Sequence, residues 1–195
     1  MLKIETLSFS YDREHPIFNG FDLEIKKGEL VAVMGPSGCG KSTLLGLIAE
    51  SLAPTDGTIT CNAQKISYAF QEPRLFPWLT VEENLGAVLP QDASPSQITD
   101  MLAFVDLSGT EKLYPDELSG GMKSRVSLAR ALLYGGDLFL LDEPFSALDR
   151  ELCISLSQKL RQHLKDIGAS AILVTHQRED ATLFADRIIE ISPVS

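Results

Sequence analysis

The chain has 195 residues, of which 44% are hydrophobic and 23% are charged, and this length suits a single domain with a substantial core. Its 17 basic and 27 acidic residues give a net charge of -10, which argues against binding a nucleic-acid duplex. Three scattered cysteines without a Cys-x-x-Cys pair argue against a disulfide framework or a zinc site. No signal segment and no run of roughly 18 apolar residues is present, so we expect a cytoplasmic protein that needs a partner if it works at a membrane.

Two kinds of strand are predicted along the chain. Residues 2–9 and 21–25 alternate apolar and polar side chains, as half-exposed strands do. Other runs are almost continuously apolar, which is typical of strands buried on both faces of a parallel sheet. These runs lie at residues 30–34, 137–142 and 171–175, with weaker candidates at 66–70 and 187–191.

Helices are predicted between these strands, which favours an α/β fold. Thr80 and Glu83 have the spacing of a capping box. The segment from about residue 71 to residue 136 lacks strong strand runs and is interpreted as a helical insertion. A further helix, ending near Gly168, is predicted from leucines at every fourth position: Leu148, Leu152, Leu156, Leu160 and Leu164.

A glycine-rich loop follows the apolar run at 30–34 and matches the pattern G-x-x-x-x-G-K-[ST]. Its backbone N–H groups and the start of the next helix suit phosphate oxygens, with a lysine that reaches the β- and γ-phosphates and a hydroxyl for Mg²⁺. The alternative is a glycine-rich turn that matches by chance. A reactive thiol is expected at the loop's cysteine, and a tolerated small residue is the alternative. The candidate nucleotide ligands are Gly35, Pro36, Ser37, Gly38, Cys39, Gly40, Lys41, Ser42 and Thr43.

Two carboxylates stand at the end of the apolar run 137–142. Asp142 is placed to hold a Mg²⁺ shell, and Glu143 to polarise an attacking water. A simple helix cap is the alternative reading of this pair. The combination with the phosphate loop predicts nucleotide hydrolysis.

A second helix start suited to anions lies at residues 119–121. Ser119 is a good N-cap, Gly120 and Gly121 follow it, and the next twelve residues have a helical pattern. An ordinary capped helix is the alternative. The chain therefore carries two candidate phosphate-binding helix starts but one catalytic carboxylate pair.

At residues 118–122, read LSGGM, the sequence resembles the ATP-binding subunits of ABC transporters. The resemblance covers nearly the whole chain, and the motifs occur in the family's order. They are residues 35–42, Gln71, residues 118–122, residues 138–142 with Glu143, residues 146–149 and His176.

The resemblance implies one ATP-binding domain over residues 1–195. Its α/β P-loop NTPase core would have a mainly parallel sheet, an N-terminal antiparallel β subdomain and an α-helical subdomain inserted at about 72–136. It also implies a head-to-tail homodimer that forms with ATP and Mg²⁺. In that dimer Ser119, Gly120 and Gly121 of each copy cover the ATP bound by the other.

The resemblance also implies roles for single residues. Tyr11 would stack on adenine, although a strand-end tyrosine is the alternative, and Gln71 would contact Mg²⁺ and act as a hinge. His176 would contact the γ-phosphate, although a lone histidine at a strand end is otherwise an ordinary edge residue. The implied catalytic residues are Glu143, His176 and Lys41, and the implied metal ligands are Ser42, Gln71 and Asp142.

The stretch beyond Gln71 indicates a partner. Phe76 and Trp78 bracket a proline, and exposed aromatics beside a hinge suit a short partner helix, with packing inside the helical subdomain as the alternative. This stretch resembles importers of the nitrate, sulfonate and taurine type. That implies a peripheral subunit on the cytoplasmic side of the inner membrane, with membrane permease subunits and an external solute-binding protein. An exporter-type or non-transport ABC ATPase is the alternative.

Overall fold

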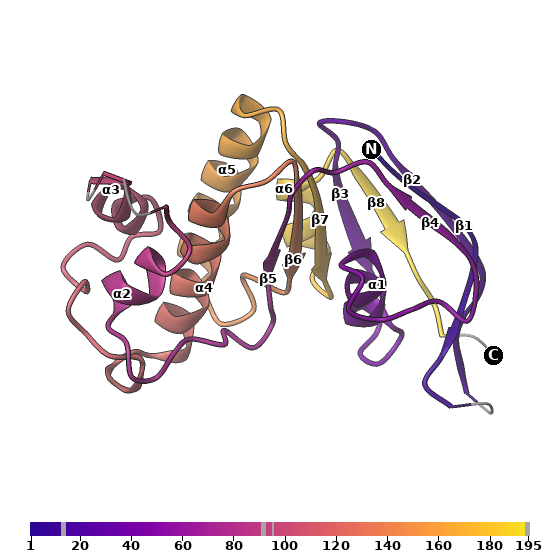
Figure 1. Ribbon diagram of the computed structural model, residues 1–195, viewed down its shortest axis with the longest axis horizontal. Helices are drawn as coiled ribbons and strands as arrows, with labels where there is room; N and C mark the ends of the chain where they lie inside the picture. The colour runs from indigo at the N-terminus through magenta and orange to yellow at the C-terminus, as the bar shows by residue number, and fades with distance from the viewer. Residues whose placement is uncertain (13–14, 91–92, 95, 194–195) are drawn as a thin grey trace.

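The computed structural model describes residues 1–12, 15–90, 93–94 and 96–193. Three parts follow one another across the molecule (Figure 1): helices α2 and α3 at one end, a parallel sheet with α4 and α5 in the middle, and an antiparallel sheet at the other end. The two ends of the chain both lie toward the antiparallel sheet. None of the helices in the described residues has the length and hydropathy that crossing a bilayer requires.

The described residues form a five-stranded parallel sheet in the order β5-β6-β7-β3-β8. Every residue of the three central strands is buried, which confirms the prediction from their continuous apolar runs. Successive side chains of β6 lie on opposite faces of the parallel sheet. Leu138 and Leu140 pack with α1, whereas Phe139 and Leu141 pack with α4 and α5. The strands are β3 (Leu30–Met34), β5 (Ile66–Ala69), β6 (Leu138–Asp142), β7 (Ser170–Thr175) and β8 (Arg187–Glu190).

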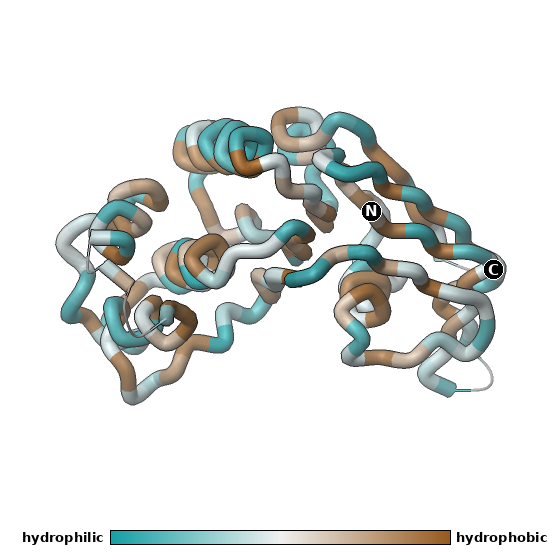
Figure 2. Tube along the Cα trace, turned by 45° about the horizontal axis from the view of Figure 1, so that its top comes forward, coloured by the Kyte–Doolittle hydropathy of each residue, from teal (hydrophilic) through white to brown (hydrophobic). Residues whose placement is uncertain are grey.

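The antiparallel sheet has the order β2-β1-β4 and lies against the side of the parallel sheet that α1 covers. Figure 2 shows hydrophilic and hydrophobic residues alternating along these strands, in contrast to the parallel ones. The sequence did not predict β4, because none of its residues is fully buried and only Ile59 and Cys61 on one face pack against the core. The three strands are β1 (Leu2–Ser10), β2 (Pro16–Ile25) and β4 (Asp56–Cys61).

The described part of residues 72–136 contains helices. This was predicted because the segment has no strong strand-like runs. Thr80 caps α2 through a complete capping box with Glu83. The inserted helices share one hydrophobic cluster with β6 and α5, so α4 joins the insertion to the central sheet. They are α2 (Val81–Gly86), α3 (Ser96–Phe104), the 3-10 turn η1 (Pro115–Glu117) and α4 (Gly120–Tyr134).

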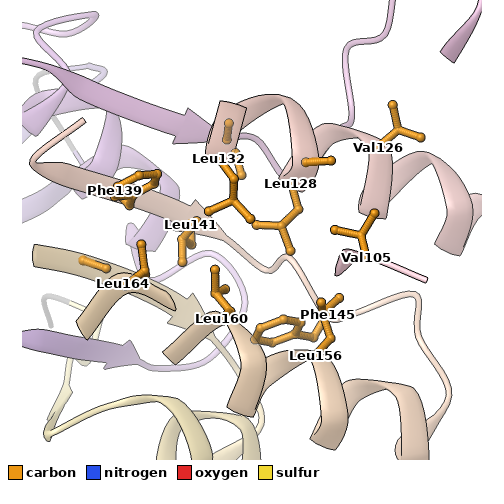
Figure 3. Packing of buried hydrophobic residues seen from close by; sticks show 14 of the residues in the cluster. Val105, Val126, Leu128, Leu132, Phe139, Leu141, Phe145, Leu156, Leu160 and Leu164 are labelled. Atoms are coloured by element: carbon orange, nitrogen blue, oxygen red, sulfur yellow. The ribbon is translucent and has the colours of Figure 1, made fainter. Parts of the chain in front are cut away.

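The predicted leucine stripe lies on α5, with one correction: Leu148 precedes the helix, which Asp149 caps through the Leu152 N–H. Figure 3 shows the stripe pointing toward α4 and β6. Its fully buried members are Leu156, Leu160 and Leu164. The remaining helices have the bounds α1 (Lys41–Ile48), α5 (Arg150–Asp166) and α6 (Arg178–Phe184).

Asp186 fastens three elements of the core together. Its carboxylate accepts hydrogen bonds from Leu30 N at 3.0 Å, Arg161 Nη2 at 2.7 Å and Lys165 Nζ at 2.5 Å. Partial burial opposes ionisation, but these hydrogen bonds outweigh it and lower the pKa of Asp186 from 3.8 to about 2.

Because the pKa of Asp186 is lower in the folded than in the unfolded chain, its contribution to stability is present above about pH 4 and is lost as pH falls toward about 2. We therefore expect Asp186→Asn to lower the free energy of unfolding at pH 7 by about 1–2 kcal/mol, allowing for the side chain's partial exposure. Urea unfolding at pH 7 and at pH 3 checks this, with Asp166→Asn as the control. A difference between mutant and wild type that does not shrink at pH 3 would contradict the assignment.

Candidate nucleotide-binding site

The predicted site residues meet because their loops all leave the carboxyl edge of the parallel sheet. The phosphate loop follows β3, Gln71 follows β5, Asp142 ends β6 and His176 follows β7. Since β3, β7, β6 and β5 are consecutive neighbours in the sheet, segments more than 100 residues apart come together at one edge.

The phosphate loop takes a backbone path that needs glycine. Gly38 and Gly40 have φ angles of 82° and 98°, a region that other residues seldom adopt. At Gly35 an added Cβ would lie 2.4 Å from Ile191 O, so this position also admits glycine alone. Lys41 is 7% exposed, and its ammonium donates to the carbonyls of Gly35 and Pro36, both at 2.9 Å. A buried cation thus lies within the loop, held only by groups that a phosphate can replace.

Cys39 corrects one expectation. Its side chain is 3% exposed and packs in the hydrophobic cluster beneath the loop, where its sulfur would be 2.6 Å from a Cβ at Gly35. A thiol so enclosed is not available to reagents, so the expected reactivity is wrong. Only the backbone of Cys39 can serve a nucleotide.

Ser42 and Asp142 form an oxygen pair at the base of the site. Ser42 Oγ donates to Asp142 Oδ1 at 3.1 Å, across 100 residues of sequence. Burial raises the pKa of Asp142, the Ser42 hydrogen bond opposes this rise, the charge of Glu143 adds to it and that of Lys41 opposes it. A buried carboxylate beside a hydroxyl is a donor set that suits a hard cation such as Mg²⁺.

Glu143 and His176 form the second pair. His176 Nδ1 lies 3.1 Å from Glu143 Oε1, and because a carboxylate only accepts, the ring nitrogen is the donor. The Glu143 side chain is 14% exposed, and its φ of 48° is uncommon outside glycine. Its N–H is bonded to Val174 O at 3.0 Å, which holds the turn. Such backbone outliers cluster at functional sites.

Tyr11 stands beside the phosphate loop as an exposed aromatic. Its ring is 66% exposed and packs edge-on against Phe9 at 4.9 Å between centroids. The Tyr11 hydroxyl lies 3.1 Å from Thr43 Oγ1, which ties the ring to the start of α1. The ring thereby lies beside the loop and lines the same cavity as Ser37 and Lys41.

Some of these residues surround one cavity of about 330 Å³, whereas Asp142 and His176 are not among its described lining residues. Gln71 lines this nucleotide cavity and also a second cavity of about 750 Å³, the side cavity, between α1 and the segment that follows β5. Ile17 of β2, which no sequence signal marked, packs against Gly40 and also lines the nucleotide cavity. The full lining is Tyr11, Ile17, Ser37, Gly38, Gly40, Lys41, Ser42, Thr43, Gln71 and Glu143.

Residues 119–121 stay apart from this cavity, since none of them is among its described lining residues. Ser119 is exposed and caps α4 by accepting from Met122 N at 3.2 Å, as predicted. The two glycines differ: a Cβ on Gly121 would lie 2.7 Å from Ala147 O, whereas one on Gly120 would meet nothing within 4 Å. Gly121 therefore lets α4 pack against the loop before α5, and Gly120 has no such role within its own chain.

A family model described as "ABC transporter" matches residues 18–146. The chain belongs to the ABC transporter family. Its sequence is 41% identical to the aliphatic sulfonates import ATP-binding protein SsuB of Bacillus licheniformis, over 88% of this chain and 71% of that protein. It is 39% identical to the bicarbonate transport ATP-binding protein CmpC of Synechococcus elongatus, over 96% of this chain but only 30% of that protein's length.

Solved structures of ABC cassettes have the same fold. A dimeric structure of MJ0796, described as a bacterial ABC transporter cassette, superposes with a TM-score of 0.90 and 30% sequence identity, over 98% of this chain and 94% of the other. A post-hydrolysis form of the same cassette, bound to ADP and Pi, gives a TM-score of 0.89 at 28% identity. The ABC assignment and the α/β P-loop fold predicted from the sequence are thus confirmed.

Proposed function

We propose that this ABC cassette binds and hydrolyses ATP to drive a membrane permease that takes up a small solute. The observation that carries the proposal is that a phosphate loop with a buried lysine, an oxygen pair and a carboxylate–histidine pair meet at one edge of the sheet, with Lys41, Ser42 and Glu143 lining one cavity. Relatives named as import proteins for sulfonates and sulfate support the transport part.

The phosphate loop positions the nucleotide. Loop N–H groups and the start of α1 receive the phosphates, and Lys41 exchanges its bonds to Gly35 and Pro36 for bonds to the β- and γ-phosphates. Tyr11 stacks on adenine beside Thr43. Ser42, Asp142 and Gln71 offer the oxygens that would hold Mg²⁺, which when bound neutralises charge on the phosphates.

Glu143 is the candidate base for the attacking water. Glu143 lines the nucleotide cavity next to the end of β6. There its carboxylate can accept the water's proton as the water oxygen bonds to the γ-phosphorus and the bond from that phosphorus to the β–γ bridging oxygen breaks, which leaves ADP and phosphate. His176 donates to the same carboxylate and so orients it, while its partly exposed ring can turn toward the γ-phosphate.

The second helix start completes the site in a dimer. Ser119 and Gly120 are exposed, and the hydrogen bonds given for them in the described residues stay within the start of α4, so they are placed to cover the γ-phosphate bound by a second copy. The dimeric solved structure of the MJ0796 cassette supports the pairing of two copies. ATP then holds the two copies together, and its hydrolysis releases them.

The proposed permease contact lies on the opposite side of Gln71. Trp78 is 71% and Phe76 41% exposed, which favours a docking role over packing inside the helical insertion. Gln71 and Ser42 line both the nucleotide cavity and the side cavity, so a permease helix beside the side cavity would lie next to residues that also face the nucleotide. The subunit would then be peripheral, on the cytoplasmic side of the membrane, and an external solute-binding protein would deliver the solute.

Replacing Trp78 by Ala tests the coupling. We expect basal hydrolysis to stay within about twofold of wild type, because Trp78 does not line the nucleotide cavity, whereas the stimulation by the co-purified permease should fall at least about tenfold with the loss of an aromatic anchor. ATPase assays with and without permease in vesicles measure both. Tyr134→Ala, an exposed aromatic on α4, is the control. Equal stimulation of mutant and wild type would remove Trp78 from the interface.

A further inference from the structure

The segment that follows Gln71 is fastened to the helical insertion rather than to the core sheet. Arg130 of α4 donates from Nη2 to Pro73 O at 2.9 Å and from Nη1 to Arg74 O at 3.0 Å. Its guanidinium also lies over the Phe76 ring, 6.0 Å from the centroid. A single fork therefore holds two successive carbonyls of a segment that is 56 residues away in sequence.

A second anchor holds the next part of the same segment. Asn84 of α2 is fully buried, accepts from Phe76 N at 2.8 Å and donates to the carbonyls of Phe76, Leu79 and Thr80 at 2.9–3.1 Å. With Arg130 it fixes residues 73–80 to α4 and α2. Residues 70–72 connect this segment to β5, and Phe70 stacks on Tyr68 with 4.0 Å between the ring centroids.

The backbone conformation of Arg74 indicates that contacts with other elements determine the path of this segment. Its φ of 47° is uncommon for a residue other than glycine. Its guanidinium stacks 4.1 Å from the Phe70 ring centroid, and its carbonyl is one of the two that Arg130 holds. A strained residue persists only where its surroundings determine its conformation, and Arg130 supplies that constraint.

The same helix carries both the fork and the second helix start. Ser119 caps the beginning of α4, and Arg130 lies eleven residues further along it, next to the point where Ser67 of β5 donates to Ala131 O at 2.6 Å. Leu128 and Leu132 pack α4 against β6 and α5 on the other side (Figure 3). A displacement of α4 would therefore reach residues 73–74 directly through the two hydrogen bonds of Arg130.

We propose that Arg130 is a positioning residue that makes the segment after Gln71 move as one body with α4. Closure of Ser119 over a second copy's ATP then shifts Gln71 and Trp78 at the same time. The inference rests on the proposed function, since it needs the ATP-bound dimer.

The chain supplies its own reporter, because Trp78 is its one tryptophan and belongs to the fastened segment. We suggest measuring Trp78 emission and acrylamide quenching without nucleotide and with MgATP. Three chains that all carry Glu143→Gln are compared: one with the native Arg130, one with Arg130→Met and one with Arg130→Lys. The ATP-induced change should fall by at least about half in Arg130→Met. Arg130→Lys, which keeps the charge but not the fork, should fall between the two.

Kinetics of the chain with Glu143 intact supply a second readout. Because Arg130 does not line the nucleotide cavity, we expect kcat to fall by about tenfold in Arg130→Met while KM for ATP stays within about twofold. Arg125→Met is the matched control: Arg125 lies on the same helix and also donates to two carbonyls, those of Val105 and Asp106, but does not touch the segment. It should lose similar thermal stability and keep the full Trp78 response.

An unchanged Trp78 response and an unchanged kcat in Arg130→Met would overturn the inference and leave the proposed function standing. If Arg130→Met and Arg125→Met lost the Trp78 response to the same extent, the inference would also be overturned, because the loss would then reflect a general loosening of α4. Failure of the proposed function looks different: the Glu143→Gln chain would stay monomeric with MgATP whichever residue stands at 130, and the inference would fall with it.

Discussion

Glu143→Gln is expected to lower ATP hydrolysis by a factor of roughly 10² to 10⁴, the range that a general base contributes. The amide keeps the size of the side chain and can still pair with His176, but it cannot accept the proton of the attacking water. ATP binding should survive, because the phosphates are held by Lys41 and the loop. The trapped nucleotide should therefore accumulate a dimer, and phosphate release and light scattering after gel filtration measure the two effects.

Glu190→Gln is the matched control for this substitution. Glu190 is an exposed glutamate whose side chain pairs only with Arg178 at the surface. It should hydrolyse ATP at the wild-type rate. A Glu143→Gln chain with wild-type turnover would remove Glu143 from catalysis, and one that stays monomeric at saturating MgATP would weaken the dimer mechanism.

Lys41→Ala should lower the affinity for MgATP by a factor on the order of 10². The ammonium is buried and donates to loop carbonyls, so it can turn to phosphate oxygens at short range, and hydrogen bonds between charged groups in such places contribute about 1.5–3 kcal/mol. Titration with a fluorescent ATP analogue measures the dissociation constant. Hydrolysis should be lost at ATP concentrations that saturate the wild type.

Lys3→Ala provides the comparison, because Lys3 is exposed and pairs only with Glu5. It should bind the analogue as wild type does. If Lys41→Ala kept wild-type affinity while its melting temperature fell, the lysine would serve the folding of the loop rather than the nucleotide.

The sequence predicted the parts of the fold that depend on burial and on local rules. Continuous apolar runs are a strong signal for strands buried on both faces, and β3, β6 and β7 match their predicted ranges closely. Caps are local as well, so Thr80 and Ser119 appear where they were predicted. Because parallel strands end at one edge, the motifs after them also had to meet.

Features that depend on contacts between distant segments could not be predicted in the same way. Strand β4 has no fully buried residue and is defined by its pairing with β1. The side chain of Cys39 is buried by β-sheet residues, although the loop pattern suggested an open thiol. The Gly121–Ala147 contact and the Arg130 fork join residues 26 and 56 positions apart, and neither has a local signature.

The account rests on a composite site in which one copy supplies the phosphate loop and the other supplies Ser119. Mixing two chains tests this most directly: Lys41→Ala, which should bind ATP on the order of 10²-fold more weakly, and Ser119→Arg, which should not cover it. In a mixed dimer the intact loop of the second chain faces the intact Ser119 of the first, so we predict that ATPase activity appears on mixing. A mixture as inactive as its two folded components, with the Ser119→Arg chain still binding ATP, would contradict the account.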